Sequence, residues 1–389
     1  MSIVIFGDKF TFPDGGAATN RVHTYAKGLT ENDINVHVVC FLNLFNAVNE
    51  GKNNDIYFYN PFKRKERSKY FVVRRWNNIK KYLKTISILH RINKNDKTIA
   101  IIVYTSLLST HLFAWFLSLI TRSKLIKECS EHPFRGFQKN DFKKKQGIVK
   151  LKIESKLSDG IFCISKFLIN LHVKFGITPQ KLFLIPSTVD PSRFIQTNKN
   201  PLSNDYIGYF GNLSFKRDNI GGLIKAFSVV SKKHPQLYLV IGGSGSKKEK
   251  EQMLSLIKKL KISSKVRLLD YLPRDEILTY ISNAKILVMV RGNDFESQAS
   301  FPSKLTEYLC TSIPLVTVNV GEIPKYLSDG INAFLVEPEN NKCLADKLDF
   351  VLQNYDYAKR VASRGQELTA TCFNYNFQAR RIISFIKSI

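Results

Sequence analysis

The sequence has few cysteines, no Asp-x-Asp pair and no hydrophobic run long enough to cross a bilayer. The six cysteines are scattered without any Cys-x-x-Cys spacing, which is typical of reduced core residues in a cytosolic protein. The longest apolar run, residues 107–120, is shorter than the roughly 20 residues that span a bilayer, so a buried helix is expected there. No basic leader precedes the first apolar run, so export is not expected.

Acidic residues are also scarce, because 32 Asp and Glu residues stand against 59 Lys and Arg residues, for a formal net charge of +27. Such an excess of positive charge favours an acidic partner. The candidates are nucleic acid, an anionic membrane surface and a phosphorylated substrate. A hydrophobic content of 44% and a mean hydropathy of -0.15 are typical of a soluble globular protein. The length of 389 residues suffices for two domains, each with its own core.

Apolar strand patterns alternate with helix patterns in two series, which predicts an α/β fold of two doubly wound, Rossmann-like domains. The first series has strands at 2–6, 35–40, 100–104, 124–128 and 160–164, and a helix at 19–30. The second series starts afresh after a polar linker at 195–204. It has strands at 206–210, 237–242, 265–269, 285–290 and 314–318, and helices at 219–233, 247–261, 274–283, 302–311 and 322–328. We place the domains at 1–186 and 187–370, with a helix in 371–389 that packs back on the first domain.

Several polar residues follow the predicted strands of the first domain. Gly15 and Gly16 lie at the turn after the first strand, where backbone without side chains can approach a ligand, although a plain tight turn is the alternative. His132 follows the strand at 124–128 and stands at the same carboxyl edge, where a structural histidine is the alternative. Ser165 is expected to cap the helix after the strand at 160–164.

Residues 63–92 combine basic side chains with aromatic and aliphatic ones, and a second basic cluster follows at 143–152. The basic residues are Lys63, Arg64, Lys65, Arg67, Lys69, Arg74, Arg75, Lys80, Lys81 and Lys84, then Lys143, Lys144, Lys145, Lys150 and Lys152. This composition fits a surface on anionic lipid headgroups, where each charge contributes about 1 kcal/mol. A solvated basic face of a lysine-rich protein is the alternative.

The run 301–309 predicts a helix with one apolar face and one polar face. Pro302 at the first helical position leaves the amides of Ser303 and Lys304 without partners inside the helix, and such an end attracts phosphate. At about 100° per residue, Leu305, Tyr308 and Leu309 share one face, while Ser303 and Glu307 lie opposite. A carboxylate there would suit the paired hydroxyls of a ribose, and an ordinary amphipathic helix is the alternative.

Other loops of the second domain bring basic residues and glycine to the same edge of its sheet. Lys216 and Arg217 follow the first strand, Gly243 follows the second, and Arg291 ends the strand before residues 301–309. Because carboxyl ends of parallel strands meet at one edge, we expect these residues to converge with the start of the 302–311 helix, as a nucleotide diphosphate requires.

In this order the segments resemble the family 4 glycosyltransferases, retaining enzymes with the GT-B fold of two Rossmann-like domains facing each other across a cleft. The resemblance covers nearly the whole chain. The matching segments are Gly15-Gly16, the hinge-like 185–194, the phosphate-clamp-like 211–217 with Asn212 in place of Arg, and the degenerate 321–325. The most specific motif is Pro-Ser-Lys-Leu-x-Glu-Tyr-Leu at 302–309, which is similar to a subgroup that lacks the first of two glutamates, here Ala299.

The resemblance implies a set of site residues. Glu307 is the expected ribose ligand, His132 approaches the sugar, Arg21 meets an anionic acceptor, and the backbone at Tyr271-Leu272-Pro273 faces the base. The residues expected to act in catalysis are His132, Lys216, Arg217 and Glu307. The residues expected to bind the donor are Gly15, Gly16, Gly243, Leu272, Pro273, Arg291, Ser303, Lys304 and Leu305.

The expected function is therefore metal-independent glycosyl transfer, with retention, from a nucleotide-diphosphate sugar to a lipid-linked or polysaccharide acceptor. Abundant Asn and Lys indicate an AT-rich bacterial genome and hence surface glycan synthesis, at the inner face of the cell membrane. No cofactor is expected. The alternatives are a sugar-nucleotide epimerase of the same architecture, a catalytically inactive homologue that scaffolds an assembly, and a basic nucleic-acid-binding protein, although no recognition module for nucleic acid is present.

Overall fold

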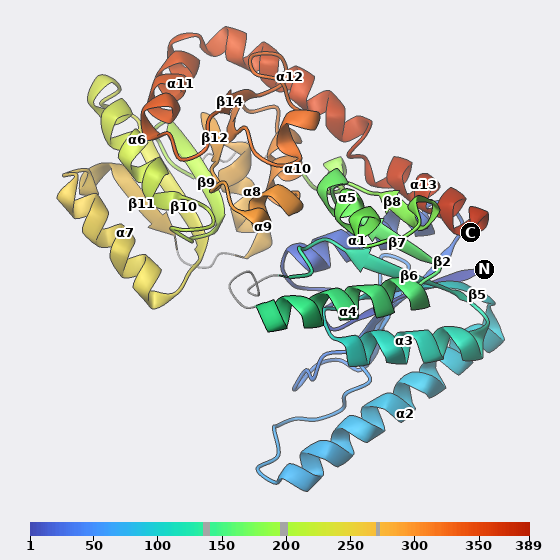
Figure 1. Cartoon of the computed structure of the whole chain (residues 1–389). Helices are drawn as coiled ribbons and strands as arrows, with labels where there is room; N and C mark the ends of the chain where they lie inside the picture. Colours follow the sequence, from blue (N-terminus) through green and yellow to red (C-terminus); the bar gives the residue numbers. More distant parts are fainter. Residues whose placement is uncertain (135–140, 195–200, 270–272) are drawn as a thin grey trace. The chain divides into compact units, whose positions relative to one another are not determined.

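The computed structural model describes residues 1–134, 141–194, 201–269 and 273–389, and it divides into two compact units (Figure 1). Unit 1 comprises Met1–Thr188 and Tyr375–Ile389, and unit 2 comprises Val189–Asn374. The sequence analysis placed the changes of domain after residues 186 and 370, whereas the structure changes unit after Thr188 and Asn374.

Unit 1 is built on one largely parallel sheet. Its described strands are β1 (Ser2–Gly7), β2 (Asn35–Cys40), β3 (Glu50–Asn53), β4 (Ile56–Tyr59), β5 (Thr98–Tyr104), β6 (Lys124–Cys129), β7 (Gly160–Cys163) and β8 (Leu182–Leu184). They lie in the order β3-β4-β2-β1-β5-β6-β7-β8, and only the pairing of β3 with β4 is antiparallel. Every residue of β1 is buried, as expected for a parallel strand with helices on both faces. The chain leaves β1 toward β2 and later returns to β5 on the other side, so the strand order reverses at β1.

The helices of unit 1 follow its strands as a doubly wound fold requires. They are α1 (Ala17–Thr30), α2 (Phe71–Asn95), α3 (Leu108–Thr121), α4 (Asp141–Leu157), α5 (Lys166–Lys174) and α13 (Tyr375–Ser388). Ser165 caps α5 by accepting a hydrogen bond from the Leu168 amide, which confirms the prediction. The expectation of a buried helix at 107–120 is wrong in part, because α3 exposes Phe116 and Leu119 on one face. None of the described helices is both long and apolar enough to cross a membrane.

The C-terminal helix α13 packs against α1, as the adjacent ribbons in Figure 1 show. The close approach depends on Gly28 of α1, because a Cβ atom there would lie 2.7 Å from the Cβ of Ala379 and 2.7 Å from the carbonyl oxygen of Tyr375. Farther along α13, Phe385 stacks on Phe183 with ring centroids 4.6 Å apart. The last 15 residues therefore complete the core of unit 1.

Unit 2 contains a fully parallel sheet within its described residues. Its strands are β9 (Tyr206–Asn212), β10 (Tyr238–Ser244), β11 (Val266–Leu269), β12 (Ile286–Met289), β13 (Leu315–Val318) and β14 (Phe334–Val336). They lie in the order β11-β10-β9-β12-β13-β14. The order reverses between β9 and β12, and ligands of doubly wound sheets bind outside the carboxyl ends of the strands at such a point.

The four helices predicted between residues 219 and 311 are present, and the other helices of unit 2 differ from the prediction. The longer helices of this unit are α6 (Ile220–Lys233), α7 (Lys247–Lys259), α8 (Arg274–Ser282), α10 (Ser303–Leu309), α11 (Asn341–Gln353) and α12 (Tyr355–Ala370). The helix predicted at 322–328 is wrong, because only the 3-10 turn Ile323–Lys325 forms there, after Gly321 with a positive φ of 62°. The short α9 (Phe295–Ala299), β14, α11 and α12 were not predicted from the sequence.

Candidate functional site

Helix α10 is fixed against the carboxyl end of β9 by Tyr308. The Tyr308 hydroxyl donates to the carbonyl oxygen of Phe210 at 3.0 Å and accepts from the Phe210 amide at 2.8 Å. Leu305, Tyr308 and Leu309 are buried, while Ser303 and Glu307 are partly exposed, so the predicted division of faces is confirmed. Pro302 is the N-cap residue and does not lie at the first helical position as predicted.

Lys304 of α10 lies against the end of β9. Its Nζ donates to the Tyr209 hydroxyl at 2.9 Å, lies 4.3 Å from the centroid of that ring, and is 3.6 Å from Oδ1 of Asp218. Space for the amine exists because residue 211 is glycine, since a Cβ atom there would lie 2.4 Å from Nζ. Burial lowers the pKa of Lys304 to about 8, with Arg291 and Arg217 adding to the shift and Asp218 opposing it.

Arg291 follows β12 and is 3% exposed. Its Nη2 donates to the Ser300 hydroxyl at 2.8 Å, whereas its buried Nη1 has no hydrogen-bond partner among the described residues. Burial lowers the pKa of Arg291 to about 10, and the charge of Arg217 contributes to that shift. A buried cation with an unpaired donor is costly, and a bound anion would satisfy it.

The loop after β9 brings Lys216, Arg217 and Asp218 to the same edge of the sheet. The carbonyl oxygen of Arg217 accepts from the Gly292 amide at 2.9 Å, which holds this loop against the end of β12. Lys216 is exposed, and Asp218 is buried where it accepts from Nδ2 of Asn212 at 3.3 Å. Arg217, Arg291 and Lys304 thus lie near one another, with the buried carboxylate of Asp218 beside Lys304 and Arg291, and we call these four residues the cationic cluster.

Gly243 lies at the end of β10, paired with Gly211 of β9. Its φ is 141°, and a Cβ atom there would lie 1.8 Å from the carbonyl oxygen of Gly211. A side chain is excluded at this point by the neighbouring backbone, so glycine is required for strand pairing as well as for any approach by a ligand.

Leu272, Pro273 and Leu305 of unit 2 were also predicted to bind the donor. Leu272, with Tyr271, lies outside the described residues, and Pro273 is the exposed N-cap residue of α8. The expected contact of Leu305 with the donor is wrong, because its side chain is fully buried and its amide donates to the carbonyl oxygen of Pro302 at 3.1 Å. Leu305 is a core residue of α10.

In unit 1, the glycine turn and His132 lie after strands, at the carboxyl edge of the sheet. Gly15 has no room for a side chain, since a Cβ atom would lie 2.1 Å from Oγ1 of Thr19, whereas Gly16 has open space and caps α1. His132 accepts a hydrogen bond from the Phe134 amide at Nδ1, at 3.1 Å, which leaves the proton of the neutral ring on Nε2. Its ring also contacts Phe167 at 5.9 Å between centroids.

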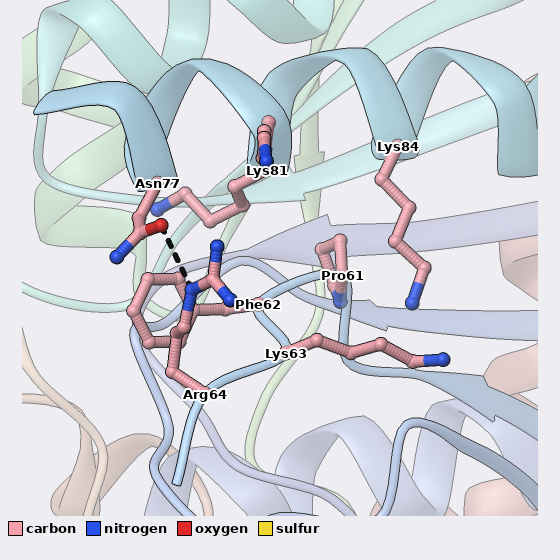
Figure 2. A pocket seen from close by; sticks show the side chains of 8 residues that line it. Pro61, Phe62, Lys63, Arg64, Asn77, Lys81 and Lys84 are labelled. Atoms are coloured by element: carbon pink, nitrogen blue, oxygen red, sulfur yellow. Dashed lines mark hydrogen bonds between the residues drawn. The ribbon is translucent and has the colours of Figure 1, made fainter. Parts of the chain in front are cut away.

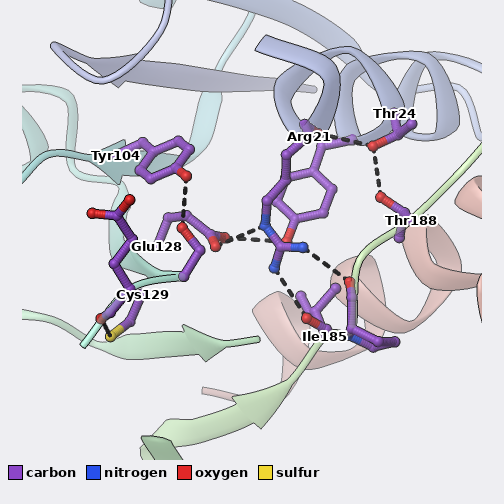
Figure 3. Close-up of polar contacts among 11 residues, drawn as sticks. Arg21, Thr24, Tyr104, Glu128, Cys129, Ile185 and Thr188 are labelled. Atoms are coloured by element: carbon purple, nitrogen blue, oxygen red, sulfur yellow. Dashed lines mark hydrogen bonds and ion pairs between the residues drawn. The ribbon is translucent and has the colours of Figure 1, made fainter. Parts of the chain in front are cut away.

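Arg21 of α1 is a structural residue, so the expectation that it meets an anionic acceptor is wrong. Figure 3 shows its guanidinium enclosed by Glu128 of β6 and by the segment after β8. Its Nε donates to Glu128 at 2.8 Å, and its Nη1 and Nη2 donate to the carbonyl oxygens of Pro186 at 2.9 Å and Ile185 at 3.0 Å. The side chain is 6% exposed, and these bonds fasten the end of the first segment of unit 1 to α1.

Sequence reasoning missed Tyr209 and Asp218, which hold Lys304, and Glu128, which holds Arg21. Asp218 directly follows the predicted Lys216-Arg217 pair, and this was the local signal that could have drawn attention to it. Tyr209 and Glu128 lie in apolar strand runs, where no local pattern separates them from core residues.

The fold and the cationic cluster define an α/β protein of the GT-B type, with a Rossmann-like sheet in each unit. Residues 192–368, most of unit 2, match the family model described as "Glycosyl transferases group 1". This match supports the resemblance to glycosyltransferases that the motifs indicated, at the level of group 1.

Curated relatives match about half of the chain. A phosphatidylinositol N-acetylglucosaminyltransferase component of Arabidopsis thaliana is 25% identical over 44% of this chain and 36% of its own length. An uncharacterised glycosyltransferase of Haemophilus influenzae is 28% identical over 47% of this chain and 49% of its own length. The D-inositol 3-phosphate glycosyltransferase of Corynebacterium efficiens is 26% identical over 46% of this chain and 41% of its own length. The chain thus spans half or less of the length of these relatives.

Solved structures resemble the whole chain. Sucrose-phosphate synthase from Thermosynechococcus elongatus has a TM-score of 0.75 and 14% identity, with 100% of this chain and 98% of that chain covered. HepE from Anabaena, solved in complex with UDP-glucose, has a TM-score of 0.70 and 14% identity over 100% of both chains. At this identity the likeness shows the fold alone.

Proposed function

We propose that this chain is a glycosyltransferase that moves a sugar from a nucleoside-diphosphate sugar to an acceptor, with unit 2 binding the donor. The observation that carries the proposal is the cationic cluster at the reversal point of the sheet, inside the segment matched to group 1 glycosyltransferases. It holds three cations against one carboxylate, which pairs with Lys304, and one guanidinium nitrogen is buried without a partner among the described residues. A diphosphate would supply the missing negative charge and acceptor atoms. The UDP-glucose bound by HepE is a donor of this class.

In this mechanism the cations stabilise the leaving nucleotide. Transfer breaks the bond between the anomeric carbon and the diphosphate oxygen, so negative charge develops on that oxygen. Arg291 and Lys304 are held in place by Ser300 and Tyr209, so little reorganisation is needed when the charge appears. Lys216 and Arg217, in the loop after β9, add two further positive charges to this site. Glu307 is partly exposed one turn along α10 from Ser303, where its carboxylate would accept from the ribose hydroxyls.

We further propose retention of anomeric configuration, in keeping with the family 4 resemblance. No carboxylate is assigned as a covalent nucleophile. As the acceptor oxygen bonds to the anomeric carbon on the face that the diphosphate leaves, the leaving phosphate oxygen takes the proton of the acceptor hydroxyl. His132, with its proton on Nε2, is assigned to a hydroxyl of the sugar, and the Gly15-Gly16 turn is assigned to the sugar and phosphates. The proposal assigns no divalent cation to the diphosphate, since the sequence carries no Asp-x-Asp pair to hold one.

The acceptor in this proposal is lipid-linked or a polysaccharide of bacterial surface glycan synthesis, and the protein works at the inner face of the cell membrane. Helix α2 supports the membrane part. Val72, Trp76, Ile79 and Leu83 are between 48% and 77% exposed and share one stripe at 100° per residue, opposite the buried stripe that contains Lys81 and Ile88. Exposed apolar side chains among lysines and arginines are typical of a helix that lies in an anionic membrane interface.

The experiment is release of nucleoside diphosphate from a panel of UDP, GDP and ADP sugars, with and without glycan and lipid-linked acceptors. Glu307→Ala and Lys216→Ala/Arg217→Ala are expected to lower donor turnover by about 10- to 100-fold, because each removes charge-assisted hydrogen bonds to the donor. Lys258→Ala/Lys259→Ala, which removes two exposed lysines at the end of α7, is the control and should match the wild type. Turnover of the site variants near wild type would contradict the site, and a rearranged nucleotide sugar formed without acceptor would indicate an epimerase instead.

A further inference from the structure

A basic hollow in unit 1 uses none of the residues of the proposed donor site. A cavity of about 320 Å³ lies between residues 61–64, which follow β4, and one side of α2 (Figure 2). Its polar lining consists of Lys63, Arg64, Asn77, Lys80, Lys81 and Lys84. The four lining residues of α2 recur at intervals of three and four, so they form one stripe along the helix. We call this site the α2 pocket.

Two cations of the α2 pocket are held by uncharged partners. Lys81 is 9% exposed, and its Nζ donates to Oδ1 of Asn43 at 2.8 Å and to the carbonyl oxygen of Phe41 at 3.3 Å. Arg64 donates from Nε to Oδ1 of Asn77 at 2.8 Å, and Asn77 is 6% exposed. These contacts orient the charged groups without supplying a negative charge, which is the arrangement of a preorganised anion site.

No acidic residue lines the α2 pocket, and within the described chain none of its five cations forms an ion pair. The neighbouring Glu50 is engaged by Arg91 at 2.7 Å. Figure 2 shows Lys63 from the loop and Lys84 from the helix reaching the same side of the pocket. Burial lowers the pKa of Lys84, and the charge of Lys63 adds to that shift, while burial lowers the pKa of Lys81 to about 8. Like charges have been brought together here at an electrostatic cost, which Asp8 offsets in part at Lys81 and Glu50 offsets in part at Lys84, and a bound anion would lower it further.

We propose that the α2 pocket binds an anionic, phosphate-bearing group. Lysine and arginine donors from two converging segments suit the several acceptor oxygens of such a group. The phosphate comes either from a lipid headgroup, because the exposed stripe of Val72, Trp76, Ile79 and Leu83 lies on the same helix, or from a soluble phosphorylated compound. The site is independent of the donor site, since its residues belong to unit 1 and the cationic cluster belongs to unit 2.

The test is hydrogen exchange of the whole chain, measured by mass spectrometry, with inorganic pyrophosphate and with vesicles. Slower exchange is expected at residues 61–85 when pyrophosphate or phosphatidylglycerol vesicles are added, relative to phosphatidylcholine vesicles. Lys63→Ala/Lys84→Ala should weaken this protection by at least about tenfold in ligand concentration, because two charge-assisted contacts are lost. Lys258→Ala/Lys259→Ala removes the same charge from unit 2 and should leave the protection unchanged. Thermal unfolding checks that both variants fold, and exchange at residues 206–220 reports the donor site separately.

The outcomes separate the two sources of phosphate. Protection by pyrophosphate that the Lys63→Ala/Lys84→Ala variant weakens supports a soluble phosphorylated ligand. Protection by phosphatidylglycerol alone, weakened in the same variant, supports a lipid headgroup. The proposal is overturned if neither ligand protects residues 61–85, or if the α2 pocket variant and the unit 2 control respond equally.

Discussion

Replacing Asp218 with asparagine tests whether the cationic cluster lacks negative charge. The change keeps the shape of the side chain and removes the carboxylate charge that lies 3.6 Å from Nζ of Lys304. At that distance and an effective dielectric constant of 20, the attraction is about 5 kcal/mol. The two side chains are 18% and 8% exposed, so solvent screens the pair little. Removing one partner of a buried pair costs about 3–5 kcal/mol, and we expect unit 2 to lose about 3 kcal/mol of unfolding free energy.

The assay is native-state hydrogen exchange of the β9 and β12 amides, which reports the opening of unit 2. Both tryptophans, Trp76 and Trp115, lie in unit 1, so urea unfolding followed by fluorescence provides an internal control that should not change. Pyrophosphate should stabilise unit 2 of the Asp218→Asn variant more than that of the wild type, because the anion replaces the lost carboxylate. A loss below about 1 kcal/mol, or equal stabilisation of both proteins, would refute the reasoning.

Two further predictions concern pH and helix packing. Because burial lowers the pKa of Lys304 to about 8, its amine loses its proton as pH rises through that value, and affinity for a nucleoside diphosphate should fall above pH 8. A bound diphosphate favours the protonated amine of Lys304, so calorimetry at pH 8 in buffers of different ionisation enthalpy should show proton uptake on binding. The Lys304→Arg variant should show none. Binding to the wild type without proton uptake would contradict the assignment of Lys304 to the diphosphate. Gly28→Ala places a Cβ atom 2.7 Å from α13 and should destabilise unit 1 by about 1–3 kcal/mol in urea unfolding, although alanine favours helix. An unchanged midpoint would show that α13 does not depend on this contact.

The two basic features of this protein differ in what surrounds their charges. In the cationic cluster a buried carboxylate already offsets part of the charge, and Arg291 keeps one unpaired nitrogen among the described residues. In the α2 pocket the buried lysine is held by an amide and a carbonyl oxygen, and the cations at its rim have no ion pairs within the part of the chain that the structure describes. Much of the net charge of +27 is scattered over the surface, so the excess by itself does not locate a binding site.

The sequence alone determined strands β1, β2, β5 to β7 and β9 to β13, most of the helices between them, the cap at Ser165 and the faces of α10, because these features depend on contacts within a few residues. It did not indicate β3, β4, β8, α2, α4 or α9. The sequence also indicated that Lys216, Arg217, Arg291 and Lys304 follow strands of one parallel sheet, whose carboxyl ends share an edge. Residues 302–309, on which the family resemblance chiefly rests, could be singled out without any structure.

Only the tertiary structure decided what each charged group touches. Arg21 meets Glu128 and residues 185–186, and Lys304 meets Tyr209 and Asp218, across separations of about 90 to 165 residues. Local patterns carry no information on such contacts, because helix and strand periodicity specify a face and do not specify what packs on it. Basic side chains therefore have different roles in this protein: Arg21 is a buried structural residue, whereas the cations of the α2 pocket remain open to an anion. The difference arises because chain topology decides which side chains are buried and which carboxylates lie near them.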